Sequence, residues 1–474
     1  MTTTGDSDTI AQTDAETPAS TNTNRRQPYG QGFLDTISEG WAERPDSMPP
    51  AREQTAYTAA RRDAVSAAFP GKRLIIPAGE LKQRSNDTDY PFRAHSAFSH
   101  LTGWAADAEP GSVLVFEPRE SGGHDVTLYF RERADRTTAE FYSDASIGEF
   151  WIGPRPPLAG VAADLGVATA HIDEFASRDG ELQLDEDEDL TRFVSELRLV
   201  KDEYEVAQMK LAVEVTARGF DDIVANIPAI VAHPRGERIV EGVFHQRARS
   251  DGNAVGYDTI AAAGPHACYL HWTRNDGAVV PGDLILIDAG AEVDSLYTAD
   301  ITRTLPVSGT FTDIQRRIYE TVREAADAAF AAARPGVKFR TVHEAAMQVI
   351  ATRVAEWGLL PVTAEEALDA DSGGHHRRYM VHGTSHHLGI DVHDCAQARR
   401  DMYYDGLLEP GMVFTIEPGL YFQIDDVTVP EEYRGIGVRI EDDILMTADG
   451  PVNLSADIPR TADEVEAWIA RLSA

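Results

Sequence analysis

The order of apolar and polar positions predicts an alternation of helices and strands in the first 190 residues. Short apolar runs bounded by Gly, Pro or charged residues are typical of strands, whereas apolar residues spaced three to four apart are typical of an amphipathic helix. The first pattern predicts strands over residues 73–80, 112–118 and 126–132. The second predicts a helix over residues 51–69 and another that begins near Thr191 and continues through residues 201–220. This interleaved order predicts an α/β domain.

The remainder of the chain combines longer helical patterns with short strand patterns. Helices are predicted over residues 313–333 and 341–357, because Arg334-Pro335-Gly336 between them is typical of a helix end. The predicted strands are bounded by Gly and Pro and cover residues 284–290, 297–305, 412–421 and 437–446. We therefore expect an antiparallel or mixed sheet covered by helices on one side, and an α/β (α+β) fold for the whole chain.

Length and composition divide the chain into three parts. A chain of 474 residues exceeds the size at which one core usually stops growing, so we expect two domains. The first 50 residues are rich in Thr, Ser, Asp, Pro and Asn and poor in large apolar groups, which predicts a disordered tail. We predict this tail over residues 1–50, a smaller domain over 51–190 and a larger domain over 191–474.

The charge balance restricts the classes of partner. The chain has 43 basic and 78 acidic side chains, giving a formal net charge of -35. Such a charge repels nucleic-acid phosphates and anionic lipid headgroups, so we expect neither as a partner. The chain does not open with a basic segment followed by an apolar one, and no run of 18 apolar residues occurs, so we expect a soluble, cytoplasmic protein.

The two cysteines, Cys268 and Cys395, are too few for a disulfide framework and are consistent with a reducing cytosol. Each lies within three residues of a histidine, so a nucleophilic Cys–His pair is one alternative for the chemistry. The carboxylates of the larger domain favour a different chemistry.

Four carboxylates stand in or beside apolar strand patterns in the last 190 residues. Asp288 ends one predicted strand and Asp300 begins the next, so a hairpin can place both on one face. Glu417 and Glu441 interrupt apolar patterns, where a buried carboxylate is costly unless it is paired or bound to a metal. Each alone is readily explained as a turn, cap or surface residue. Together with histidine they form a ligand set for divalent ions, which predicts metal-assisted hydrolysis.

Residues 382–394 contain four histidines, namely His382, His386, His387 and His393. His382 and His386 have the spacing of the two histidines in a HExxH zinc helix, but Gly383 stands where that motif has its glutamate. We therefore do not expect a protease of that type. At least one of the four should be structural, and His387 is the first choice.

Five segments in order resemble the pita-bread metallopeptidases, which include methionine aminopeptidases, prolidases and Xaa-Pro aminopeptidases. They are IDAG (287–290), ADITRT (299–304), HGTSHHLGIDVHD (382–394), EPGMVFTIEPGLY (409–421) and YRGIGVRIEDDI (433–444). The segment YPFRAHSAFSHLTGW (90–104) of the first domain also resembles bacterial Xaa-Pro aminopeptidases. The resemblance covers roughly residues 50–470 and implies a pita-bread catalytic domain preceded by a smaller α/β domain.

The resemblance implies a site for two divalent ions, expected to be Mn(II). The implied ligands are Asp288, Asp300, His386, Glu417 and Glu441. Asp300 and Glu441 would bridge the ions. Asp288 would complete the coordination of one ion, and His386 with Glu417 would complete the coordination of the other. Glu417 would also be the proton shuttle for attack by a metal-bridged hydroxide. The residues implied to line the substrate site are His271, His382 and His393, with Tyr421 and Arg439 supporting the ligands.

The implied activity is removal of an N-terminal residue that precedes proline, by a homo-oligomer, either a dimer or a tetramer. The resemblance leaves open whether Arg399 or Arg400 contacts the peptide. One alternative is a prolidase restricted to Xaa-Pro dipeptides. Another is a metal-free peptide-binding module on the same fold, which the complete ligand set disfavours.

Overall fold

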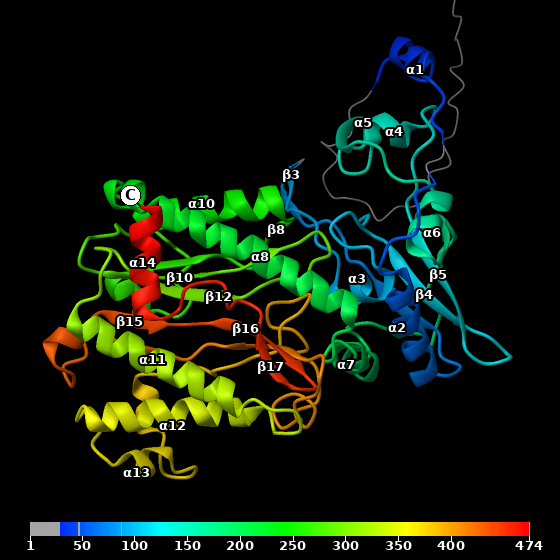
Figure 1. Ribbon diagram of the computed structural model, residues 1–474. Coiled ribbons are helices and arrows are strands. Elements are labelled where there is room, and N and C mark those ends of the chain that lie inside the picture. The colour runs from blue at the N-terminus through cyan, green and yellow to red at the C-terminus, as the bar shows by residue number, and fades with distance from the viewer. Residues whose placement is uncertain (1–28, 46–47, 87, 474) are drawn as a thin grey trace, which may run out of the picture.

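The computed structural model describes residues 29–45, 48–86 and 88–473. Figure 1 shows two lobes, the smaller formed by the first part of the chain and the larger by the rest. The smaller lobe contains α1 (Gln31–Ile37), α2 (Thr55–Ala68), β1 (Leu74–Pro77), β2 (Gln83–Ser85), β3 (Thr88–Asp89), α3 (Ser96–Thr102), β4 (Val113–Pro118), β5 (His124–Phe130), α4 (Ala139–Ser143), α5 (Glu149–Ile152), α6 (Leu158–Leu165), β6 (Ala168–His171), β7 (Leu182–Gln183) and α7 (Glu188–Glu196).

A mixed five-stranded sheet organises the smaller lobe, with the order β6-β5-β4-β1-β7. Strand β4 is antiparallel to β1 and β5, whereas β6 and β7 are parallel to their neighbours. Leu74 pairs with Phe116 in the register of β1 and β4, and both side chains are fully buried. The helix predicted over residues 51–69 and the three predicted strands are confirmed by α2, β1, β4 and β5.

Helix α1 falls within the segment predicted to be disordered. The rings of Tyr29 and Phe33 each lie 5.2 Å from the ring of Tyr142, so this part of the segment has an apolar partner in α4. The remainder of that prediction concerns mainly residues 1–28 and 46–47, which lie outside the described residues.

The prediction of one helix from Thr191 through residues 201–220 was wrong at its centre. The chain forms α7 and then a separate helix, α8 (Glu203–Ala225). Asp202 caps α8 through a capping box with Glu205, which favours a new helix start at this point. The N–H of Lys201 donates to the carbonyl of Gly411, so the intervening residues pair with a distant segment instead of continuing a helix.

The larger lobe follows from α8 to the end of the described chain. Its elements are α8, α9 (Ile227–Ala232), α10 (Gly236–Asp251), β8 (Ala254–Val255), β9 (Ile260–Ala263), β10 (Leu284–Ala289), β11 (Ala291–Glu292), β12 (Ile301–Pro306), α11 (Asp313–Ala332), α12 (Arg340–Glu356), α13 (Ala364–Leu368), β13 (Val413–Ile416), β14 (Gly419–Phe422), β15 (Ile436–Arg439), β16 (Asp442–Thr447), β17 (Gly450–Asn453) and α14 (Ala462–Leu472).

Small antiparallel sheets form the centre of this lobe, with the orders β12-β10-β9, β13-β16-β17, β14-β15 and β11-β8. Figure 1 shows α8 and α10 along one side of these strands and α11 and α12 along the other. The helices predicted over residues 313–333 and 341–357 are confirmed by α11 and α12, and the strand predicted over residues 284–290 is confirmed by β10.

Two predicted strands are each divided in the structure. Residues 412–421 form β13 and β14, and residues 437–446 form β15 and β16. Strand β13 pairs with β16 in one sheet, whereas β14 pairs with β15 in another. Glu417 and Glu441 therefore lie between strands, at the places where the chain passes from one sheet to the next. The apolar pattern continues across both breaks because the residues on either side are buried.

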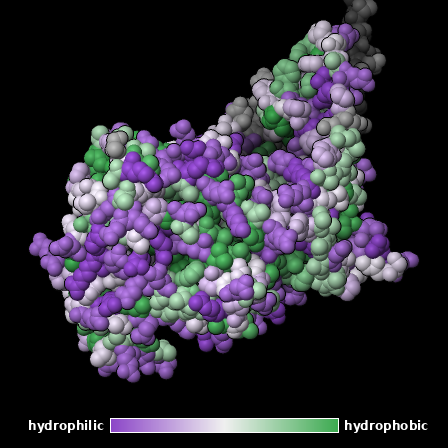
Figure 2. All heavy atoms as spheres, in the orientation of Figure 1, coloured by the Kyte–Doolittle hydropathy of each residue, from purple (hydrophilic) through white to green (hydrophobic). Residues whose placement is uncertain are grey.

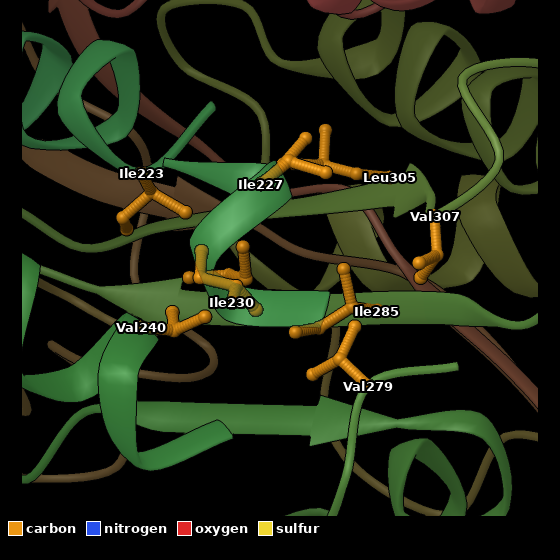
Figure 3. A pocket seen from close by; sticks show the side chains of 9 residues that line it. Ile223, Ile227, Ile230, Val240, Val279, Ile285, Leu305 and Val307 are labelled. Carbon is orange, nitrogen blue, oxygen red and sulfur yellow. The ribbon is translucent and has the colours of Figure 1, made fainter. Parts of the chain in front are cut away.

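The larger lobe has a tightly packed core. Figure 3 shows the aliphatic side chains around a cavity between α8, α9 and α10 and strands β10 and β12. Its volume is only about 10 Å³ and its lining is entirely apolar, so it is a packing defect and not a ligand site. Figure 2 shows mainly hydrophilic side chains on the visible surface, in keeping with the acidic composition. Among the described helices, none is long and apolar enough to cross a membrane.

Candidate metal centre

Asp288 and Asp300 are brought together by the pairing of β10 and β12. Asp288 pairs with Thr302, and Asp300 lies two residues before Thr302. Because side chains alternate along a strand, Asp300 and Thr302 point to the same face, next to Asp288. The hairpin geometry expected from the sequence therefore occurs.

Glu417 and Glu441 are brought together by the two sheet crossings. Ile416 with Asp442 is the final pair of β13 and β16, and Gly419 with Arg439 is the first pair of β14 and β15. Glu417 lies between β13 and β14, and Glu441 lies between β15 and β16. The N–H of Glu441 donates to the carbonyl of Thr302 at 3.1 Å, which joins this crossing to the strand that follows Asp300.

His386 reaches the same place from a loop that runs along β13. The carbonyl of His386 accepts a hydrogen bond from Thr415 N–H at 2.9 Å, and His387 forms a bridge with Phe414. The His386 Nε2 atom lies 3.2 Å from Asp300 Oδ2 and 3.5 Å from Glu417 Oε1. Asp300, His386 and Glu441 each offer a ligand atom, and these atoms all lie within 4.8 Å of one another.

The site concentrates negative charge away from water. Burial, followed by repulsion from neighbouring carboxylates, raises the pKa of Glu441 well above its usual range, and it also raises the pKa of Asp300. The same causes raise the pKa of Glu417 to about 7. Burial alone would lower the pKa of His386, but the hydrogen bond to Asp300 and the charge of Glu417 raise it to about 9. Cations in the cluster would relieve this repulsion.

Tyr257 also indicates that the carboxylates are arranged for cations. Its phenolic oxygen lies 2.6 Å from Asp288 Oδ1 and 2.5 Å from Asp300 Oδ1. One hydroxyl proton can serve only one of these oxygens, so the second close contact joins two acceptor oxygens, which a cation held by the carboxylates would stabilise. Oxygen ligands with a single imidazole are the donor set of divalent ions such as Mn(II), and the residues present therefore fit a metal site.

Arg439 and Tyr421 support the ligands from β15 and β14. Arg439 forms a short buried ion pair with Asp288, donates to Tyr421 Oη at 3.1 Å and donates to Thr302 Oγ1 at 3.1 Å. Thr302 Oγ1 in turn donates to Glu441 Oε2 at 2.6 Å. Arg439 thus contacts Asp288 directly and Glu441 through the hydroxyl of Thr302.

The histidines predicted to line the substrate site lie around the cluster. His382 Nδ1 lies 3.5 Å from Glu417 Oε2, and its Nε2 lies 2.8 Å from Tyr421 Oη. The His393 ring is 4.3 Å from the His386 ring. Burial and then Arg439 lower the pKa of His382 to about 3, so it is neutral at physiological pH. Burial, followed by repulsion from His386, lowers the pKa of His393. His271 is exposed and is a further, smaller source of repulsion for both His382 and His393, so it lies near them.

Other residues singled out from the sequence lie outside the cluster. His387 is fully buried between Phe339 and Tyr403, with ring distances of 4.5 and 4.6 Å. Arg399 pairs with Glu196 and Arg400 with Asp405, so each already has an acidic partner. Burial raises the pKa of both cysteine thiols, that of Cys268 to about 12, which disfavours a thiolate nucleophile.

Three neighbours of the ligands were missed by sequence reasoning. Tyr257 and Thr302 contact the carboxylates as described, and both oxygens of the fully buried Asp443 accept from Asp300 N–H at 3.2 and 3.3 Å. A polar residue two positions from Asp300 or Glu441 on a strand was the available signal for Thr302 and Asp443. Tyr257 precedes β9 in a loop, and no local pattern marks it.

Comparison with known proteins agrees with this site. Residues 207–448 match the metallopeptidase family M24. The chain belongs to metallopeptidase family M24. Residues 58–187 match the aminopeptidase P N-terminal domain, so both lobes contain segments typical of M24 aminopeptidases. The family implies divalent metal ions, and the buried Asp, His and Glu group described above can hold them.

Individual M24 relatives align over nearly the whole chain. Xaa-Pro aminopeptidase 1 of Streptomyces coelicolor is 50% identical, with 96% of this chain and 97% of the relative covered. Xaa-Pro aminopeptidase of Escherichia coli is 33% identical over 84% of this chain and 93% of the relative. The low-pH structure of E. coli aminopeptidase P superposes with a TM-score of 0.77 at 31% identity, covering 89% of this chain and 99% of that one. The pita-bread fold and the preceding smaller domain expected from the sequence are thereby confirmed.

Proposed function

We propose that this protein is a dinuclear-metal aminopeptidase that hydrolyses the bond between an N-terminal residue and a following proline. The proposal rests on Asp300, His386 and Glu441, whose ligand atoms all lie within 4.8 Å of one another. Glu417 lies 3.5 Å from His386, and Asp288 is joined to Asp300 through the hydroxyl of Tyr257. Support for proline as the second residue comes from relatives that are named Xaa-Pro aminopeptidases and align over nearly the full chain.

The five side chains would hold two ions. Asp300 and Glu441 would be shared by both ions, Asp288 would complete the ligands of one, and His386 with Glu417 would complete those of the other. We infer Mn(II) as the metal, because an oxygen-rich set with one imidazole suits it. Two such ions, when bound, activate water and polarise the scissile carbonyl. Four carboxylates balance the charge of two divalent ions.

Glu417 is the proposed proton carrier. It accepts the proton of the attacking water and delivers it to the leaving nitrogen, a role that needs one group near both atoms. His382 lies beside Glu417 and is held by Tyr421, so its ring orientation is fixed. His382, His393 and His271 then hold the peptide and the developing negative charge on its carbonyl oxygen.

Proline at the second position makes the scissile bond a tertiary amide, whose nitrogen has no hydrogen. Like any amide nitrogen, it must receive a proton to leave as an amine. A positioned proton carrier meets that requirement.

We further propose that the protein acts as a homo-oligomer, as the resemblance implies. Light scattering would measure the mass of the assembly.

The test uses protein stripped of metal and reloaded with Mn(II). Release of the N-terminal residue is measured for Xaa-Pro-Yaa peptides and for matched Xaa-Ala-Yaa peptides. We expect manganese-dependent cleavage of the proline peptides only. Cleavage of an Xaa-Pro dipeptide with an intact Xaa-Pro-Pro tripeptide would instead identify a prolidase. Cleavage of neither by manganese-loaded protein would contradict the proposal.

A further inference from the structure

A buried carboxylate outside the metal centre holds the loop that carries His271. Glu237, at the start of α10, has an exposed fraction of 0%. Its Oε1 accepts from Ala263 N–H at 2.8 Å and lies 2.7 Å from His266 Nδ1. Its Oε2 accepts from Trp272 Nε1–H at 3.0 Å and from Gly277 N–H at 2.7 Å. All four partners lie within residues 263–277, on both sides of His271.

The loop is packed closely around this carboxylate. The rings of His266 and Trp272 stack with centroids 3.8 Å apart, so two of the Glu237 partners also support each other. A Cβ atom added at Gly277 would lie 2.8 Å from Glu237 Oε2 and 2.7 Å from His266 Cε1. The backbones of the two residues are also joined, because Glu237 N–H donates to the carbonyl of Gly277 at 3.2 Å. Only glycine allows the backbone to approach this closely.

The other face of the loop contacts the strands that support the metal ligands. Cys268 Sγ donates to the carbonyl of Phe422 at 3.3 Å, and Gln423 Nε2 donates to the carbonyl of Cys268 at 2.8 Å. A Cβ atom at Gly437 of β15 would lie 2.4 Å from the carbonyl oxygen of Ala267. The loop is therefore held between α10 and the β14–β15 pair, which contributes Tyr421 and Arg439 to the site.

His271 itself is not anchored through its ring. Its side chain is exposed, and within the described part of the chain its imidazole has no hydrogen bond or ion pair. The position of that imidazole beside His382 and His393 thus depends on the backbone of the loop.

We propose that Glu237 is a positioning residue that sets the place of His271 at the substrate site. This inference rests on the proposed function, in which His271 contacts the peptide. A carboxylate suits the role because both of its oxygens are acceptors only, and four donors converge on it. Glutamine has the same shape but replaces one oxygen with an NH₂ group, which would face two donors and push that part of the loop away.

The experiment compares Glu237→Gln with Glu241→Gln, the same change one helical turn later. Glu241 is only partly buried and accepts a single loop hydrogen bond, from Asn275 Nδ2 at 3.1 Å. Cleavage of an Xaa-Pro-Yaa peptide and manganese content are measured for both variants. We expect kcat/KM to fall about 10- to 100-fold in Glu237→Gln, because small misplacement of a substrate-contacting group has effects of that order. Manganese content should not change, and Glu241→Gln should stay within about threefold of the unaltered protein.

A double-mutant cycle with His271→Ala separates positioning from general destabilisation. If Glu237 acts through His271, adding Glu237→Gln to His271→Ala lowers kcat/KM no further. Gly277→Ala, which keeps the carboxylate but displaces the loop, should show the same dependence on His271 and covers the case in which Glu237→Gln does not fold. The inference would be overturned if the losses in kcat/KM from the loop change and from His271→Ala multiplied in the double variant. Full activity of both Glu237→Gln and Gly277→Ala would also overturn it. Unaltered activity of His271→Ala would instead overturn the proposed role of His271, whatever the loop variants show.

Discussion

The phenolic oxygen of Tyr257 lies 2.5 Å from Oδ1 of Asp300, the carboxylate proposed to be shared by both ions. The same oxygen lies 2.6 Å from Asp288, so one hydroxyl orients both aspartates of the hairpin. Residues that hydrogen-bond to metal ligands fix the orientation of those ligands, and their loss typically weakens metal binding.

Tyr257→Phe should therefore weaken metal binding without removing a ligand. We expect manganese affinity to fall about 10- to 100-fold, the usual range for loss of such a contact. Competition with a chelator measures this affinity, and circular dichroism shows whether the fold is kept. Unchanged affinity would mean that Tyr257 does not orient the aspartates.

Glu417→Ala should remove activity and one metal site together, because the proton carrier and a ligand are lost in one change. We expect kcat to fall by at least about 100-fold and bound manganese to fall from two ions per chain to one. Elemental analysis after gel filtration measures the metal. Glu409→Ala is a matched control, since the exposed Glu409 is also followed by Pro-Gly. Near-normal turnover of Glu417→Ala would refute its assignment.

His382→Ala should lower turnover while leaving the metal in place. His382 contacts Glu417 and Tyr421 but is not proposed as a ligand. We expect a fall in kcat of about 100-fold, the order found when a donor to a developing oxyanion is removed. His393→Ala should behave similarly. Loss of both ions in either variant would show that the ligand histidine has been assigned wrongly.

Glu109 in the smaller lobe, away from the proposed metal ligands, should make the stability of the protein depend on pH. Burial raises the pKa of Glu109 from 4.5 to about 7. Between these values the folded state binds more protons than the unfolded state, so stability falls as pH rises from 4.5 to 7. Glu109→Gln should therefore raise the melting temperature at pH 8 and have little effect at pH 5. The exposed Glu120→Gln serves as control, and an equal gain at both pH values would be inconsistent with this cause.

Sequence patterns predicted α2, α11, α12 and the hairpin that carries Asp288 and Asp300, because local periodicity determines them. They joined α7 to α8 and did not indicate α10. They did not reveal the breaks at Glu417 and Glu441. Apolar residues continue on both sides of each break, and only the change of strand partner separates the paired elements.

The supporting residues were harder to predict for a related reason. Tyr257 reaches the aspartates through tertiary packing, and Glu237 meets its loop across the space between α10 and β9. Neither contact has a sequence period or a characteristic motif. Arg439, by contrast, lies two residues from Glu441, and a position so close to a ligand could be recognised.

If these five side chains hold two ions that are needed for cleavage, metal binding and activity must rise together. A titration of metal-stripped protein with Mn(II), following bound metal and Xaa-Pro-Yaa cleavage in the same samples, measures both. We expect saturation at two ions per chain, with no cleavage in stripped protein and full cleavage at saturation. Cleavage by stripped protein, or saturation at one ion per chain or fewer, would refute the two-metal site.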